Sequence, residues 1–101
     1  MRGLRTSSDP VVTSRAVAEL KACAQGGHRD AQFELGALYK LGQGVGKNRV
    51  RALGWFLRAT VQHDVDAAIQ SGLLMDVLQP DQVWRAQRWA YDLREDERWA
   101  T

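Results

Sequence analysis

The sequence contains a single cysteine, Cys23, which excludes an internal disulfide. Long apolar runs are also missing: none reaches the roughly 18 residues that a membrane-spanning helix needs, so we expect no membrane partner. The opening residues, MRGLRTSSDP, lack the apolar core of a signal peptide, which makes the cytoplasm the expected compartment. Cys23 is a small residue within a helical pattern, and we expect it to be buried in the core.

An excess of charge of one sign is missing as well. The chain has 14 Lys and Arg against 12 Asp and Glu, and a net charge of +2 is too small to predict a nucleic-acid partner. A hydrophobic fraction of 45% and a charged fraction of 26% are ordinary for a soluble globular chain. The length of 101 residues predicts one domain, residues 1–101, in which the polar residues 1–8 are expected to be disordered.

The residue patterns of catalysis and metal binding are likewise missing. His28, His63 and Cys23 show neither the i, i+4 nor the C-x-x-C spacing that is typical of zinc sites. The glycine-rich residues 42–47 resemble a phosphate loop, but a Walker loop needs a preceding strand and a Ser or Thr after its lysine, where this chain has Asn48. We therefore expect no metal, no cofactor and no enzymatic activity.

Residues 30–59 read as two short helices joined by a glycine-broken turn. Spacings of i, i+4, i+7 and i+8 give the first helix one apolar stripe, and a second stripe lies beside it, so this helix needs neighbours on two sides. Gly36 lies mid-helix, where it costs about 1 kcal/mol relative to alanine, and this predicts a close approach by another backbone. Gly42 is expected to end the helix and Asn48 to cap the next one. The stripes are Ala31, Leu35, Leu38 and Tyr39; Phe33, Ala37 and Leu41; and, in the second helix, Ala52, Trp55, Phe56 and Ala59, with Leu53, Leu57 and Val61.

These residues follow the pattern A-x-x-x-L-G-x-x-Y-x-x-G-x-G-V and then R-A-x-x-W-x-x-x-A. The pattern resembles the Sel-one-like repeat, a relative of the tetratricopeptide repeat, whose members form α-solenoids that act as protein-binding adaptors. The chain departs from it at Gly46-Lys47-Asn48, where an acidic residue is usual, and at Thr60, where a second alanine is common. The matching positions are Ala31, Leu35, Gly36, Tyr39, Gly42, Gly44, Val45, Ala52, Trp55 and Ala59.

The chain also repeats internally. Residues 15–36 align without gaps on residues 51–72, an offset of 36 positions, which indicates a repeat architecture. The first helix, beginning near Asp9-Pro10 or Thr13, corresponds to the second half of a leading repeat. A fourth helix is predicted at about 65–78 and a fifth after Gln79-Pro80, with Trp89 on its core stripe. We therefore expect an all-α fold: a short right-handed α-solenoid of about five antiparallel helices, comprising a half repeat, one full repeat and a divergent capping repeat.

The expected function is a non-enzymatic protein–protein interaction, in which a peptide or partner protein of unknown identity binds the concave face of the repeat array. The first helices of each pair line that face in the related fold, although Phe33 and Ile69 could instead be consumed in packing between pairs. The residues assigned to it are Gln32, Phe33, Ala37, Lys40, Ile69 and Leu73.

The C-terminal helix leaves alternatives open. Trp84, Arg88 and Trp99 mix aromatic and basic character, which is typical of interface hot spots and of some single-strand binders. Packing or self-association ranks first here, binding of a partner protein second, and nucleic-acid binding last because acidic residues lie nearby. With fewer repeats than a stable stack usually has, either atypical ends seal the core or a homodimer continues it.

Overall fold

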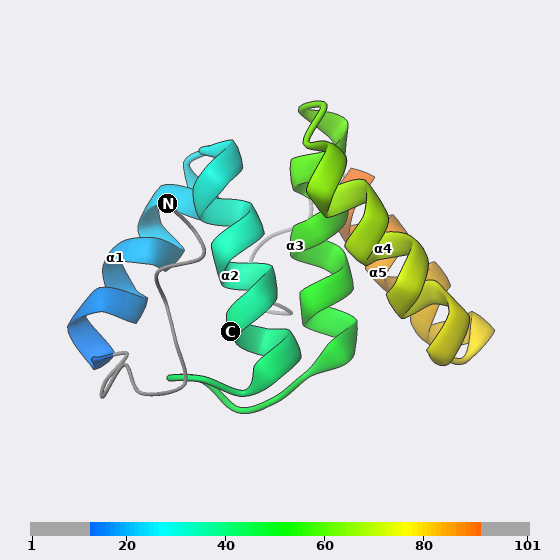
Figure 1. Cartoon of the computed structure of the whole chain (residues 1–101), viewed down its shortest axis with the longest axis horizontal. Helices are drawn as coiled ribbons and strands as arrows, with labels where there is room; N and C mark the ends of the chain where they lie inside the picture. Colours follow the sequence, from blue (N-terminus) through cyan, green and yellow to red (C-terminus); the bar gives the residue numbers. More distant parts are fainter. Residues whose placement is uncertain (1–12, 92–101) are drawn as a thin grey trace.

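The computed structural model describes residues 13–91, which form five α-helices and contain no β-strand (Figure 1). The expectation of an all-α fold with five helices is confirmed. The residues expected to be disordered, 1–8, lie outside the described part, as does Trp99. No helix within residues 13–91 is long and apolar enough to cross a membrane. The helices are α1 (Ser14–Gln25), α2 (Arg29–Leu41), α3 (Arg49–Val61), α4 (Val65–Val77) and α5 (Pro80–Tyr91).

The helix boundaries follow from local hydrogen bonds that the sequence predicts. The side chain of Asn48 accepts a hydrogen bond from the backbone N–H of Arg51 at 3.0 Å, which caps the start of α3. At the end of α2, Gly42 takes the left-handed conformation with φ of 74°, and its N–H donates to the carbonyl of Leu38 at 2.7 Å. α5 begins at Pro80. Proline suits the first position of a helix, because the N–H group that it lacks would have no hydrogen-bond partner within the helix there.

The 36-residue offset recurs in the structure of α2 and α4. Both helices are 13 residues long, and their first residues lie 36 positions apart. Each begins with a side-chain cap on the backbone N–H three residues later: His28 accepts at 3.3 Å and Asp64 at 3.1 Å. Corresponding inner positions are buried in both helices: Ala31, Leu35 and Leu38 in α2, and Ala67, Ser71 and Leu74 in α4.

α3 lies at the centre of the packing. α2, α4 and α5 all pack against it, and α1 packs against α2 (Figure 1). Residues 52–57 are buried without interruption. The ring of Trp55 meets that of Trp89 in α5 edge-to-face at 4.9 Å between centroids, and Phe56 meets Phe33 in α2 at 5.3 Å. This geometry is favoured by the quadrupoles of the rings, so α3 supplies aromatic contacts to both neighbours.

Gly36 allows the closest of these approaches. A Cβ atom at this position would lie 3.0 Å from Cδ1 and Cε1 of Phe56, so a side chain here would press directly into a buried ring. The equivalent glycine of α4, Gly72, has open space: an added Cβ would meet nothing within 4 Å. The predicted approach by another backbone is therefore wrong: at the first glycine the close contact is made by a side chain, and at the second there is none.

The expectation that Cys23 is buried is wrong: its side chain is exposed. In the internal alignment Cys23 corresponds to Ala59, which is fully buried between α3 and its neighbours. α1 packs chiefly against α2, so the side of α1 that would face a preceding helix carries no such cover within residues 13–91. Two expected stripe residues at helix ends, Leu41 and Val61, are also exposed, at 59% and 58%.

Candidate protein-binding face

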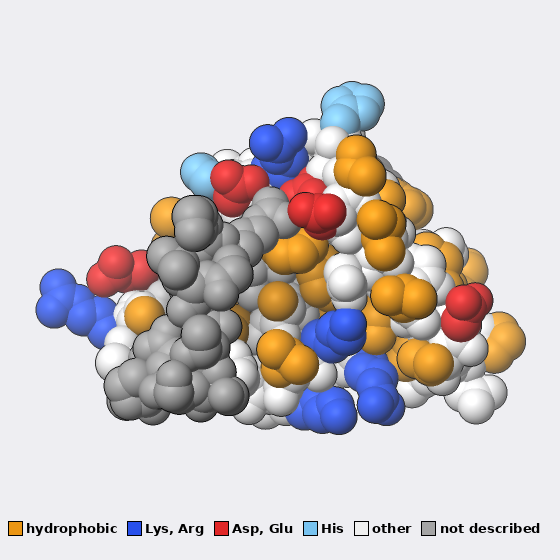
Figure 2. All heavy atoms as spheres, viewed as in Figure 1, with side chains coloured by type: hydrophobic (Ala, Val, Ile, Leu, Met, Phe, Trp, Pro, Cys, Tyr) orange, Lys and Arg blue, Asp and Glu red, His pale blue; other side chains and the backbone are white. Residues whose placement is uncertain are grey.

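One face of the molecule combines exposed apolar side chains of α4 with half-buried apolar side chains of α2. Figure 1 shows α2, α3 and α4 side by side, and in the same view Figure 2 shows hydrophobic side chains running along α4. The ammonium group of Lys40 donates to the side-chain oxygen of Gln70, which links α2 to α4. We call this surface the α2–α4 face and define it by Phe33, Ala37, Lys40, Ile69 and Leu73.

The apolar part of this face is a stripe along α4. Ile69 and Leu73, both assigned from the sequence, are 56% and 53% exposed. Val65 and Val77, which sequence reasoning missed, continue the stripe and are 72% and 65% exposed. Four apolar residues spaced four apart lie along one side of a helix, so their spacing was a readable signal. A row of exposed apolar side chains makes this face the candidate for a binding surface.

The α2 side of the face is more closely packed. Phe33 and Ala37 are half-buried, and the Phe33 ring lies against Phe56 in α3. The sequence left open whether Phe33 and Ile69 pack between helices. Phe33 does pack partly on the core, whereas Ile69 remains 56% exposed.

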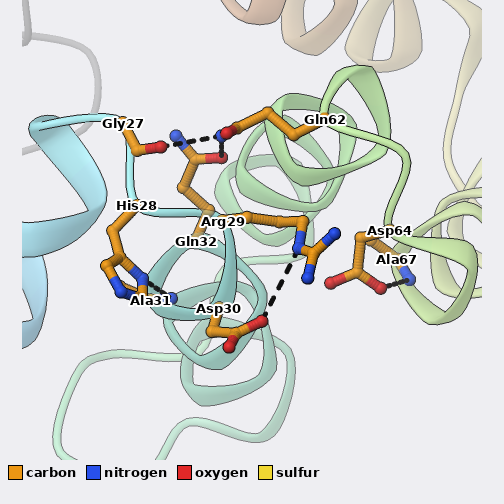
Figure 3. A network of polar contacts seen from close by, with 9 residues as sticks. All are labelled: Gly27, His28, Arg29, Asp30, Ala31, Gln32, Gln62, Asp64 and Ala67. Atoms are coloured by element: carbon orange, nitrogen blue, oxygen red, sulfur yellow. Dashed lines mark hydrogen bonds and ion pairs between the residues drawn. The ribbon is translucent and has the colours of Figure 1, made fainter.

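Gln32 lies inside the molecule and not on the α2–α4 face. It is 4% exposed, and its amide nitrogen donates to the carbonyl of Ala24 at 3.1 Å. The amide nitrogen of Gln62, at the end of α3, donates both to the Gln32 side-chain oxygen at 2.9 Å and to the carbonyl of Gly27 at 2.8 Å (Figure 3). Gln32 thus joins the end of α1 to the ends of α2 and α3, and we leave it out of the candidate surface.

Trp84 and Arg88 form a separate surface on α5. Trp84 is 59% exposed, and the Arg88 guanidinium carbon lies 5.4 Å from its ring centroid, a cation–π contact one helical turn apart. In Figure 1 α5 lies behind α4, so this pair is not part of the α2–α4 face. The third residue assigned to this surface, Trp99, lies outside the described residues.

Charge is distributed unevenly along the α2–α4 face. α2 and α4 run in the same direction, and their first turns carry Asp30 and Asp66, where acids complement the helix dipole. Arg29 offsets part of this charge, with Nε 3.7 Å from an oxygen of Asp30. The other end carries Lys40 in the last turn of α2, Lys47 in the α2–α3 turn and Arg49 at the start of α3, against one acid in the last turn of α4, Asp76. In Figure 2 acidic side chains gather toward the upper end of this face and basic ones toward its lower edge.

A hollow of about 480 Å³ opens at this basic end. Its wall is apolar where Val50, Val77 and Leu78 line it, and cationic where Lys47 and Arg49 line it. Neither cation pairs with an acidic side chain anywhere in the described chain. Because Val77 is also the last member of the α4 stripe, the apolar surface continues from the helix into the hollow.

The positions of the family pattern serve packing and turns. Gly42 and Gly44 take positive φ angles of 74° and 73° in the turn between α2 and α3. The remaining pattern positions in the helices are all buried: Ala31, Leu35, Gly36, Tyr39, Ala52, Trp55 and Ala59.

The described residues contain no group of three or more His, Cys, Asp or Glu that could hold a metal ion. The side chain of His28 instead caps the start of α2 through its Nδ1 atom.

Comparison with known proteins adds no assignment. No protein-family model matches the chain, and no curated protein matches it at a significant level.

Proposed function

We propose that this chain is a non-enzymatic protein–protein interaction module that binds a peptide or a partner protein on the α2–α4 face. The observation that carries the proposal is the exposed apolar stripe along α4. Complete burial of a Val, Leu or Ile side chain stabilises a complex by about 1.5–3 kcal/mol. Because these side chains are already partly covered, each would contribute roughly half as much, which is sufficient for a peptide-sized contact.

α4 is apolar on two opposite sides. Its inner side packs on the core through Ala67 and Leu74, which are 0% and 3% exposed. Its outer side carries the stripe of Val65, Ile69 and Val77, and a helix that is apolar all round is normally covered all round. Within residues 13–91 nothing covers the outer side, so a partner molecule is the natural source of cover.

We further propose that the five helices form a short right-handed α-solenoid of the Sel-one-like type. α1 would be a leading half repeat, α2 and α3 the full repeat, and α4 and α5 a divergent capping repeat. The 36-residue offset between α2 and α4, their matching caps and the buried pattern positions support this arrangement. In such an array α2 and α4 would line the concave side, and the module would serve as a cytoplasmic adaptor.

The proposal is tested by affinity capture from the native cell, with Leu73→Arg as the face variant. Tyr91→Arg is the matched control, because Tyr91 is 57% exposed at the end of α5. We expect at least one protein to be captured by the wild type and by Tyr91→Arg but not by Leu73→Arg. That protein, once purified, should bind the wild type with at least tenfold higher affinity than the face variant. Identical captured sets for both variants would contradict the proposal, provided that circular dichroism shows both to be folded.

A second candidate is a structural module that self-associates through the open side of α5. The observation that favours it is Trp84, which is 59% exposed beside Arg88, a composition enriched at interface hot spots. Sedimentation over a range of concentrations, with Trp84→Ser for comparison, distinguishes the two. A dimer that this substitution dissociates supports self-association, and a monomer at all concentrations rejects it.

A further inference from the structure

Resting on the proposed function, we propose that the occupant of the α2–α4 face is an amphipathic segment of another protein that ends in a cluster of Asp or Glu residues. Its apolar side would lie along the α4 stripe, and its acidic end would enter the hollow beside Lys47 and Arg49. The stripe covers the 13 residues from Val65 to Val77, about 18 Å of helix, which matches roughly three turns of a partner helix.

The chemistry of the hollow selects an acidic end. Its two cations, Lys47 and Arg49, are exposed and have no acidic partner within the described chain, so both can meet a bound carboxylate. A carboxylate placed there gains two charge-assisted contacts, while neighbouring apolar atoms remain on Val50 and Leu78. A basic segment end would be repelled by the same pair.

The opposite end of the face sets the orientation of the segment. Asp30 and Asp66 lie in the first turns of α2 and α4, so an acidic end placed there would meet like charges. Electrostatic complementarity of this kind fixes register and excludes wrong partners more than it adds affinity. The face therefore distinguishes the two ends of a bound segment.

A second copy of this chain fits the stripe poorly. An antiparallel pairing of two α4 helices would match Ile69 with Leu73 of the other copy, because the stripe is symmetric about its centre. The same pairing places Asp66 of each copy opposite Asp76 of the other copy. α4 contains no basic residue that could offset this repulsion.

The experiment is selection from a displayed library of 18-residue peptides. Apolar residues are fixed at i, i+4, i+7 and i+11, and three positions at each end are randomised among Glu, Lys and Gln. The full-length chain is the target, alongside Leu73→Arg and a charge-reversed double variant, Lys47→Glu with Arg49→Glu. Glutamate suits position 49, the first residue of α3, so this variant retains its fold.

We expect peptides with Glu at one end only, enriched on the wild type and lost on Leu73→Arg. The double variant should instead select Lys at that end. Each exposed ion pair is worth roughly a factor of three, so a Glu-ended peptide should bind about tenfold tighter than its Gln-ended form, with the difference shrinking at high salt.

Three outcomes overturn the inference. Enriched peptides without a charge preference, or with the same preference on the double variant, reject the acidic end but leave the proposed function standing. If no peptide is enriched over the Leu73→Arg background, the proposed function fails as well. If sedimentation shows a wild-type dimer that Leu73→Arg dissociates, the occupant is a second copy and not an acidic segment.

Discussion

The pair of glycines at equivalent positions in α2 and α4 allows the close contact at Gly36 to be measured against an internal control. We expect Gly36→Ala to destabilise the protein and Gly72→Ala to stabilise it. Both substitutions replace a glycine inside a helix, so both gain about 1 kcal/mol of helix propensity. They differ in what the new methyl group meets: the ring of Phe56 at 3.0 Å in the first case, and nothing within 4 Å in the second.

The magnitude follows from the immobility of that ring. Phe56 is 1% exposed and is held against Phe33, so it cannot move aside without disturbing the α2–α3 contact. Overpacking a tight core costs about 1–3 kcal/mol. Because the propensity gain is common to both variants, their difference in unfolding free energy should equal this cost. In a domain of this size it corresponds to a gap in Tm of roughly 4–8 °C per kcal/mol.

Urea denaturation followed by tryptophan fluorescence is a suitable assay, because Trp55 and Trp89 are both buried. Phe56→Leu supplies a further test: with the ring removed, Gly36→Ala should lose most of its penalty, giving a clear coupling energy in a double-mutant cycle. If Gly36→Ala stabilises the protein as much as Gly72→Ala does, the close contact is not real and the reasoning is refuted.

Three further predictions follow from single contacts. Gln32→Ala should lower the unfolding free energy by about 1 kcal/mol, because the buried carbonyl of Ala24 loses one of its two donors and keeps only the N–H of Gly27; urea denaturation measures the loss, and a change below 0.5 kcal/mol would contradict it. Asp64→Ala should cost about 1 kcal/mol through the lost α4 cap, while Asp64→Asn should retain most of the stability because asparagine caps equally well. Equal losses would mean that the charge, and not the cap, matters. Cys23 should react with a thiol reagent in the folded protein at a rate close to that in urea, whereas a rate that rises more than tenfold on unfolding would show that it is buried.

Local signals predicted the helices and their ends well. The cap by Asn48, the left-handed Gly42 and the start of α5 at Pro80 all depend on chemistry within four residues along the chain. The core stripe of α3 was also readable, since Trp55 and Phe56 are too large to be left at the surface of a helix that is apolar on both sides. These features need no knowledge of which helices are neighbours.

Features that depend on neighbours could not be read in the same way. Cys23 and Ala59 occupy equivalent positions of the repeat, yet one is exposed and the other buried, because α3 has helices on several sides while α1 packs chiefly on α2. Gln32 carried no sequence signal for burial either. Its amide finds partners 8 and 30 residues away, and only the folded junction of three helix ends brings them together.

The α4 stripe shows why the candidate site lies between these two cases. The spacing of Val65, Ile69, Leu73 and Val77 determines that they share one side of a helix, but the inner residues Ala67 and Leu74 are equally regular. Periodicity alone cannot decide which apolar side faces the core. The structure shows which side is inner: Ala67, Ser71 and Leu74 are buried, and Ser71 and Ala67 are small enough for close packing on α3. Val65, Ile69, Leu73 and Val77 lie exposed on the other side, so their burial would have to come from another molecule, and this is the physical basis on which we propose a binding role for this face.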